Sequence, residues 1–341
     1  ESIGPLTLGP LTITDEVELL GQGVTLHAAG GGRVLEVLAG GAATIRDVTI
    51  TGGSAQLGGG IYNEGTLRVL GSTIWGNAAT SGGGIYNEGT LWVVNSTISG
   101  NSATSDGGGI YNQGTLTVVN STIAGNAADA DNDAAGGGGG IRTADGGPTT
   151  LHNTIVAGNV LGSLAANDLS GALATGSSHN LVGGDPRLDS SGLQDNGGPT
   201  QTIALLLDSP AIDEGDDELA RDHAGNLLTT DQRGAGFVRV IGSAADIGAW
   251  ECPNAPPTVD AGADQAVGEG SQVSLAARFT DLGPRGTHNA TIDWGDGTGV
   301  VDGTVVELPT TVAGSVVGSH VYADDGQYTV TVTVTDYEGL W

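Results

Sequence analysis

The chain contains one cysteine, Cys252, no methionine and no lysine, so all ten of its basic residues are arginines. A single cysteine excludes a disulfide framework and a thiolate metal site. No apolar run approaches the roughly 18 residues that a membrane-spanning helix needs, so we predict no membrane span in this chain.

Positive charge is scarce as well, since 39 acidic and 10 basic residues give a formal charge of −29 at pH 7. Nucleic-acid binding requires lysine or arginine to displace the counterions of phosphate, so we predict no nucleic-acid partner. The composition is rich in glycine, threonine and asparagine and poor in lysine and cysteine, which favours an exported bacterial protein. We therefore predict an extracellular or bacterial cell-surface location.

Repetition is what the sequence has in abundance. Three nearly identical copies between Gly58 and Asn126 read GGGIYNEGTLRVLGSTIWGN, GGGIYNEGTLWVVNSTISGN and GGGIYNQGTLTVVNSTIAGN. They are headed by Ile61, Ile85 and Ile110, a period of 24 and then 25 residues, which is typical of a solenoid. Each copy holds short runs of Thr, Val, Ile and Leu broken by Gly and Asn, without helical spacing. We predict an all-β fold in which each copy forms one turn of a parallel β-helix.

Comparison of the copies predicts side-chain directions, because successive strand residues face opposite sides. The position that varies from Arg68 to Trp92 to Thr117 is predicted to face water, and its neighbours to face the core. The predicted core columns are Leu67, Leu91 and Leu116; Val69, Val93 and Val118; and Ile74, Ile98 and Ile123.

Asparagine recurs at two further positions of the repeat, which we place at the corners. Asparagine tolerates left-handed backbone, and its amide can bond to the asparagine one coil above, so each column is predicted to form a structural ladder. The two columns are Asn63, Asn87 and Asn112, and Asn77, Asn101 and Asn126.

We predict three segments along the chain. Residues 1–252 form the β-helix, with irregular C-terminal coils and an end-cap at about 185–252, because the last coil of a solenoid exposes apolar core. About ten coils would give a rod roughly 45–50 Å long. Residues 253–258 form a proline-rich linker, and residues 259–341 form a small β-sandwich with short alternating strands.

Three resemblances to known families refine this prediction. The repeat copies resemble the right-handed β-helix repeats of bacterial surface proteins of the polymorphic outer-membrane-protein type. A resemblance to the end of the choice-of-anchor Q domain of exported bacterial proteins rests on DPRL…GGPTQT…SPAIDEG…DQRG…DIGAWE. A resemblance to the PKD domain, an immunoglobulin-like module, rests on DWGDGTG…HVYADDGQYTVTVTVTD. Together they imply a right-handed parallel β-helix followed by a PKD-like sandwich.

Relative to these families, both ends of the chain are expected to be open. The first coil lacks the N-terminal segment that usually caps it, and the sandwich lacks its last strand. Unpaired backbone edges are templates for another chain, and a head-to-tail contact that does not close produces a fibre. We therefore expect residues 1–14 and 330–341 to mediate head-to-tail assembly. The alternative is that both ends are proteolysis boundaries that mediate no assembly.

The function predicted from these features is that of a non-catalytic extracellular structural or adhesive protein. Its expected partners are further copies of itself, in a homo-oligomer or filament, and a surface glycan or another cell-surface protein. The alternative is a secreted polysaccharide lyase or hydrolase, or a glycan-binding protein, on a β-helix scaffold. A hydrolase needs two carboxylates facing one sugar bond, and the regular coils offer little of this kind, so no catalytic residue is assigned.

Two groups of residues are candidate sites. The outward aromatic residues are candidates for glycan or partner contact, although stacked rings also gain by simply packing together. These are Tyr62, Tyr86, Tyr111, Trp75 and Trp92.

The second candidate site is an acidic run in a glycine-rich insertion. Asp129, Asp131 and Asp133 place oxygen ligands at alternate positions, which suits Ca²⁺, the only cofactor predicted. The run lacks the later bidentate glutamate of a full EF-hand loop, so the alternative interpretation is a solvated acidic insertion.

Overall fold

The computed structural model describes residues 6–132, 136–144, 146–162, 165–254, 256–281, 287–307, 313–336 and 341. Throughout these ranges the chain is all-β and contains no helix. None of the described segments is therefore a helix long and apolar enough to cross a membrane. The chain divides into two compact units, one made of Glu1–Val240 with Ala244–Glu251, the other of Ile241–Ser243 with Cys252–Trp341.

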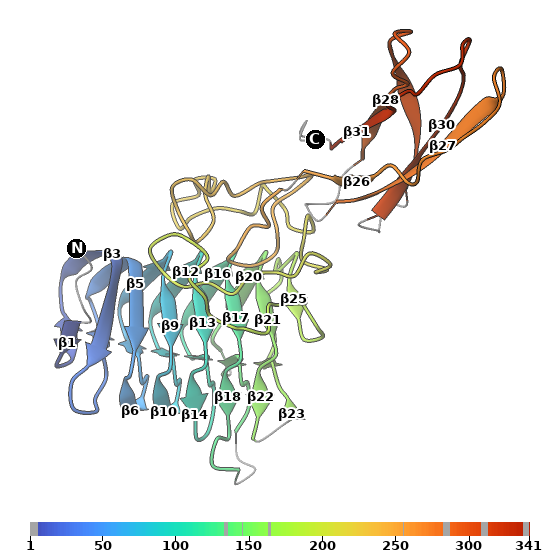
Figure 1. The fold of residues 1–341 in the computed structure, drawn as a ribbon. Coiled ribbons are helices and arrows are strands. Elements are labelled where there is room, and N and C mark those ends of the chain that lie inside the picture. Colours follow the sequence, from blue (N-terminus) through green and yellow to red (C-terminus); the bar gives the residue numbers. More distant parts are fainter. Residues whose placement is uncertain are drawn as a thin grey trace. The chain divides into compact units, whose positions relative to one another are not determined.

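The first unit is a parallel β-solenoid whose coils stack in register, which confirms the predicted fold class (Figure 1). In sheet B, Ile61 lies opposite Ile85, and Ile85 opposite Ile110, so each repeat copy is one coil. Sheet B contains seven strands: β2 (Leu11–Ile13), β4 (Leu35–Val37), β7 (Ile61–Asn63), β11 (Ile85–Asn87), β15 (Ile110–Asn112), β19 (Ile141–Thr143) and β24 (Leu169–Ser170).

Sheet A forms a second side of the coil and is bent along its length. The long strands β3 (Glu16–Ala28) and β5 (Ala42–Thr51) give way in later coils to pairs of short strands, and β1 (Leu6–Leu8) pairs with β3. On one side of the bend lie β8 (Thr66–Leu70), β12 (Thr90–Val94), β16 (Thr115–Val119) and β20 (Thr149–His152). On the other lie β9 (Thr73–Trp75), β13 (Thr97–Ser99), β17 (Thr122–Ala124), β21 (Ile155–Ala157) and β25 (Leu181–Val182).

The bend is produced by one left-handed residue per coil. Asn95, Asn120 and Asn153 have φ angles of 46°, 41° and 48°, a region that asparagine adopts more readily than most residues. Sheet C closes the coil with short strands: β6 (Ser54–Leu57), β10 (Ala78–Ser81), β14 (Ser102–Ala103), β18 (Ala127–Ala128), β22 (Val160–Leu161) and β23 (Ala165–Ala166), the last pair antiparallel.

The core of the solenoid consists of the predicted aliphatic columns. Every member of the Leu67, Val69 and Ile74 columns is 0% exposed, so the predicted inward directions are confirmed. The isoleucines that head the copies are equally buried. Each coil thus contributes the same few side chains to a continuous apolar interior, whose burial is the main stabilising contribution to the stack.

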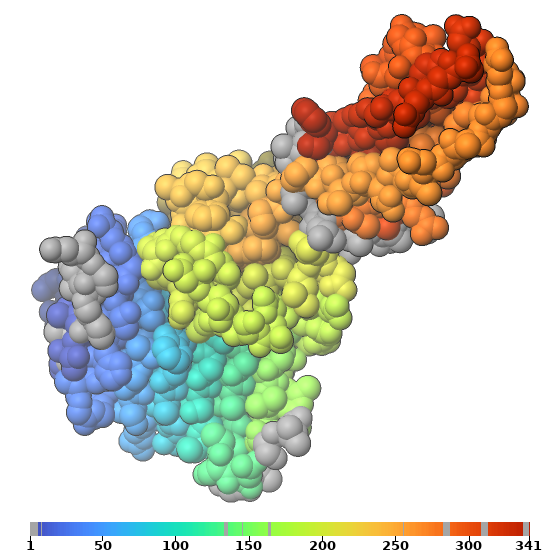
Figure 2. Space-filling model, in the orientation of Figure 1, coloured from blue at the N-terminus to red at the C-terminus, as the bar shows by residue number. Residues whose placement is uncertain are grey.

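Residues 185–251 do not cap the end of the solenoid, so that expectation is wrong. They contain no strand and run back along the bend of sheet A, with bonds to coils from Gly71 through Asn95 and Asn120 to Asn153 (Figures 1 and 2). The physical reason is that sheet A carries apolar side chains and polar groups on this outward face, and the segment buries the former and bonds to the latter. We call residues 185–251 the flank segment.

Because residues 185–251 do not add coils, the solenoid is shorter than the predicted rod. The estimate of about ten coils treated these residues as further turns, whereas sheet B has seven strands. Six spacings of ~4.8 Å give about 29 Å from the first of these strands to the last.

The second unit is an antiparallel β-sandwich with its own core. Its strands follow the order β26-β27-β30-β29-β28-β31, and Phe279, Ile292, Trp294 and Val316 are buried at its centre. The strands are β26 (Thr258–Asp260), β27 (Gln272–Thr280), β28 (Asn289–Asp293), β29 (Val300–Glu307), β30 (Ala313–Val321) and β31 (Thr331–Thr335).

Candidate functional site

The asparagine column of Asn77, Asn101 and Asn126 forms a continuous chain of buried side-chain hydrogen bonds. Asn77 Nδ2 donates to Asn101 Oδ1 at 3.0 Å, and Asn101 Nδ2 donates to Asn126 Oδ1 at 2.9 Å. Asn126 continues the chain to Asn159 at 2.9 Å, one coil beyond the predicted column. The amides of Asn77, Asn101 and Asn126 each donate as well to one backbone carbonyl of their own coil and one of the preceding coil, so the ladder ties neighbouring coils together.

The column of Asn63, Asn87 and Asn112 forms a ladder of the same kind. The backbone conformation of both columns differs from the left-handed one that was expected. Asn63 Nδ2 donates to Asn87 Oδ1, and Asn87 Nδ2 to Asn112 Oδ1, both at 2.7 Å. No asparagine of either predicted column has a positive φ angle. The left-handed residues are instead those of the Asn95 column, because the ladder asparagines lie within or just beyond strands.

The tyrosine column forms a stack on the outward face of sheet B. The ring centroids of Tyr62 and Tyr86 lie 5.6 Å apart, and those of Tyr86 and Tyr111 lie 4.8 Å apart with an interplanar angle of 10°. The guanidinium of Arg33 covers the free face of Tyr62 at 4.6 Å, and Arg142 is the strand neighbour of Tyr111. Because Arg33 and the neighbouring rings cover the faces of Tyr62 and Tyr86, these two rings present edges and hydroxyls rather than a flat platform for a sugar ring.

Carboxylates surround the edge of this stack. The hydroxyl of Tyr62 lies 3.0 Å from Glu64 Oε1 and 3.0 Å from Glu88 Oε2. A phenol carries one proton and can donate it to only one of the two at a time. The edge of the stack is therefore acidic and suits a ligand that brings hydrogen-bond donors or a cation.

The tyrosine stack predicts a defined pH dependence. Burial, reinforced by Glu64 and Glu88, raises the pKa of Tyr62, and burial beside Tyr111 raises the pKa of Tyr86 to about 12. Tyrosines of the unfolded chain ionise near ~pH 10, so the folded state keeps these protons longer. The stabilisation is complete below about pH 10 and is lost as the pH rises from there through about 12.

Ultraviolet titration of tyrosinate tests this expectation. We expect a late-ionising fraction among the six tyrosines, which shrinks by one residue in Tyr86→Phe. Ionisation of all six together at the pH of free tyrosine would contradict it.

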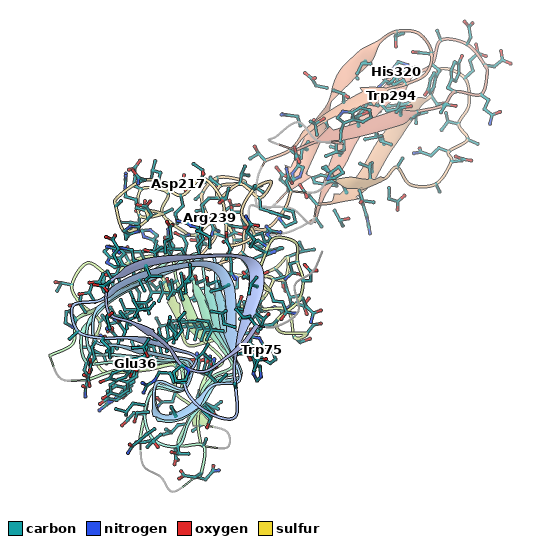
Figure 3. The ribbon with its side chains drawn as sticks, turned by 90° about the vertical axis from the view of Figure 1, so that its left-hand side faces the viewer. Glu36, Trp75, Asp217, Arg239, Trp294 and His320 are labelled. Atoms are coloured by element: carbon teal, nitrogen blue, oxygen red, sulfur yellow. The ribbon has the colours of Figure 1, made fainter. Side chains whose placement is uncertain are left out.

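The two tryptophans differ in their surroundings. Trp75 is 40% exposed, as predicted for an outward contact residue (Figure 3). Trp92 also lies on the outward face but is half-buried, because it packs against an outer apolar cluster that also contacts Leu228 of the flank segment. Its role in glycan or partner contact remains a prediction. The members of this cluster are Leu70, Val94 and Val119.

The candidate calcium residues are not brought together into a site that the structure describes. Asp129 is 5% exposed and left-handed with a φ angle of 50°, whereas Asp131 is exposed. Asp133 lies outside the described residues. Among the residues that are described, no group of three or more His, Cys, Asp or Glu side chains could hold a metal ion. The calcium site remains a prediction.

The flank segment supplies functional contacts that sequence reasoning missed. The side chain of Gln232 is 1% exposed and inserts between coils, where Thr97 Oγ1 donates to its Oε1 at 2.6 Å. Its Nε2 donates to Thr73 Oγ1 and to Thr200 Oγ1, both at 3.0 Å. One side chain thus connects two coils and the flank segment.

A buried ion pair fixes the flank segment further along (Figure 3 labels Arg239 on that side of the coil). The side chains of Arg239 and Glu251 are both 0% exposed and form a charge-assisted hydrogen bond. Arg239 Nη1 also donates to the carbonyl of Gly248 at 3.1 Å and to Asn95 Oδ1 at 3.4 Å. Asn95 Nδ2 in turn donates to the carbonyl of Thr230 at 2.7 Å, so the left-handed bend of the coil is bonded on both sides.

The sequence contains a pattern that indicates that the outward face of sheet A is covered. Leu70, Val94 and Val119 follow the inward valines of their strands, so they occupy outward positions, yet all three are aliphatic. They are 2–4% exposed in the structure. An aliphatic column at an outward position indicates a covered face, and that signal would have placed the flank segment on sheet A.

The second unit is built around a tryptophan. Trp294 is 2% exposed and stacks on His320 with ring centroids 5.1 Å apart, while its carbonyl accepts a hydrogen bond from the Tyr322 hydroxyl at 2.9 Å. These residues belong to the DWGDGTG and HVYADDGQY stretches. Residues 254–340 match the family model described as PKD domain.

The PKD resemblance is thereby confirmed, whereas the resemblances of the repeats and of the flank segment to specific surface-protein families remain predictions. No curated protein and no solved structure matches the chain. Within the PKD domain, Asp296 accepts hydrogen bonds from the hydroxyl and N–H of Thr298 at 2.6 and 3.1 Å. These bonds, with a smaller contribution from His320, lower the pKa of Asp296 to about 2.

Proposed function

We propose that this protein is a non-catalytic structural or adhesive protein of the bacterial cell surface. The observation that carries the proposal is the continuous buried ladder of Asn77, Asn101, Asn126 and Asn159, which joins successive coils through side chains as well as backbone. Fully satisfied buried polar networks make a fold rigid and specific. A rigid stack is suited to hold a contact surface at a fixed distance from the cell.

The PKD domain supports an extracellular location for this role, because PKD domains are modules of surface and secreted proteins. The formal charge of −29 supports it further, since it favours solubility and disfavours anionic membrane surfaces. Both observations agree with an adhesive or spacer protein.

Head-to-tail assembly is the finer part of the proposal. Among the described residues, β2 pairs only with β4 at one end of sheet B, and β24 pairs only with β19 at the other. Each therefore presents an edge on which another copy can add a parallel strand. Of the expected contact segments, residues 1–5 and 337–340 lie outside the described residues.

Electron microscopy and sedimentation of Thr12→Pro test the assembly. Thr12 is an exposed residue in the middle of β2, where proline removes an edge N–H. We expect the unaltered protein to form linear oligomers at high concentration, Thr12→Pro to remain dispersed, and the matched control Thr12→Ala to assemble. Dispersed monomers of the unaltered protein at every concentration would contradict assembly.

Catalysis is tested separately with a panel of neutral and acidic polysaccharides, with and without Ca²⁺. We expect no release of reducing ends and no unsaturated products. Turnover of any polymer in the panel would contradict the non-catalytic role and favour a polysaccharide lyase or hydrolase.

A further inference from the structure

A cavity of about 300 Å³ lies on the outward face of sheet A, beside His223 of the flank segment. Ala42 and Thr44 of β5 form its small-residue floor, and Glu16 and Glu18 of β3 line one side. The opposite side carries Arg46, Arg68 and His223 and is therefore basic (the last of these comes from the flank segment).

The two arginines of this cavity are unusual in a chain so rich in carboxylates. Arg46 of β5 lies opposite Leu70, so Arg68 of β8 is its diagonal neighbour. Neither forms an ion pair within the described part of the chain. Six other arginines do form one: Arg33, Arg142, Arg187, Arg221, Arg233 and Arg239.

Buried donors and acceptors in the cavity wall are also unsatisfied. Arg68 Nε and His223 Nδ1 are both shielded from solvent and have no hydrogen-bond partner. Such buried polar atoms are costly. Because they are shielded from solvent, a ligand in the cavity meets the outer guanidinium nitrogens of Arg46 and Arg68, which line it. A guanidinium matches the two oxygens of a carboxylate or sulfate group, so the missing ligand group is an oxyanion.

We propose that this cavity binds an acidic sugar, with its carboxylate or sulfate group on Arg46 and Arg68 and its hydroxyls toward Glu16 and Glu18. Sugar hydroxyls donate hydrogen bonds, which carboxylates accept, whereas a bare polyanion would be repelled on the glutamate side. The shared chemistry is the oxyanion, and the two sources are an acidic sugar and free inorganic sulfate. The proposal does not depend on the structural role above.

Binding is measured by titration calorimetry and by the arginine Nε–H signals in NMR, with glucuronate, inorganic sulfate and glucose as probes. The chain has ten arginines and no lysine, so these spectra are simple. We expect glucuronate to bind in the millimolar range and to shift the Arg68 signal. We expect sulfate to bind more weakly and glucose not to bind.

Two variants locate the site. Arg68→Gln is expected to weaken glucuronate binding at least tenfold. Thr44→Glu, which places a carboxylate beside both arginines without removing any packing, is expected to abolish it. The matched control is Arg142→Gln, which alters an outward arginine on β19 of sheet B and should leave binding unchanged.

The proposal is overturned if the folded protein binds none of the probes, or if glucuronate binding survives Thr44→Glu. Sulfate binding equal to or tighter than glucuronate binding would overturn the assignment to a sugar and leave an anion site. Circular dichroism confirms that each variant is folded before its binding is interpreted.

A pH readout distinguishes the cavity from a general charge effect. Burial, followed by Arg68 and Arg46 and opposed by Asp222, lowers the pKa of His223. The imidazole is therefore neutral at pH 7, and a bound oxyanion favours its protonation. Glucuronate affinity should rise as the pH falls from about 7 to 5, because the protonated imidazole attracts the bound oxyanion. His223→Asn should remove this dependence.

Discussion

Arg239→Met is expected to lower the free energy of unfolding of the solenoid by about 3–5 kcal/mol, because it removes the positive charge that faces the buried carboxylate of Glu251. Glu251 is 0% exposed, and its charge cannot reach water in the folded state. The variant also removes the donor to the carbonyl of Gly248. Chemical denaturation that follows the solenoid transition measures the loss, with the PKD domain as the internal reference.

Two controls separate the buried charge from the loss of an arginine. Arg187→Ala breaks an ion pair whose arginine side chain is 45% exposed, and should cost less than about 1 kcal/mol. The double variant Arg239→Met/Glu251→Leu removes both charges and should recover much of the stability. A loss below about 1 kcal/mol in Arg239→Met alone would show that the flank segment is not held by this pair.

Asn101→Ala is expected to cost a similar amount, about 3–5 kcal/mol, because several buried groups lose their partners at once, at about 1–3 kcal/mol each. Asn101 Oδ1 accepts from both the backbone N–H and the side chain of Asn77. Its Nδ2 donates to the carbonyl of Ile74 and to Asn126. Too little space is opened for water to replace all of these bonds.

The matched control for the ladder is Thr117→Ala, at a half-buried outward position of β16. We expect it to change the free energy of unfolding by less than about 0.5 kcal/mol, as is usual for surface positions. Hydrogen exchange gives a second readout, since loss of the ladder should open the amides of the neighbouring coils first. Equal stability of Asn101→Ala and Thr117→Ala would contradict the structural role of the ladder.

The architecture of the coils could be predicted from the sequence because each coil of a solenoid places the same kind of residue at the same structural position. Three copies aligned by Ile61, Ile85 and Ile110 reveal which positions are constrained, and the inward columns follow from the alternation of a strand. The same comparison found the ladder asparagines. Local pattern and tertiary position agree in such a fold, so little else is needed.

The flank segment and the basic cavity could not be predicted in the same way. They depend on contacts between residues far apart in sequence, such as Gln232 with Thr97 and His223 beside Arg68, and no repeat relates them. The ring faces of the tyrosine stack are a similar case. Arg33 lies over the ring of Tyr62 through packing between coils, which a single sequence does not display.

The most direct test of the account is a distance between spin labels at the two ends of one column. Thr12 and Ser170 occupy the first and last positions of the outward column of sheet B, six strand spacings apart. In a Cys252→Ala background, pulsed electron spin resonance should give a narrow distribution centred near about 29 Å, widened only by the label linkers. A broad distribution, or one centred far from this value, would contradict a rigid stack of seven coils.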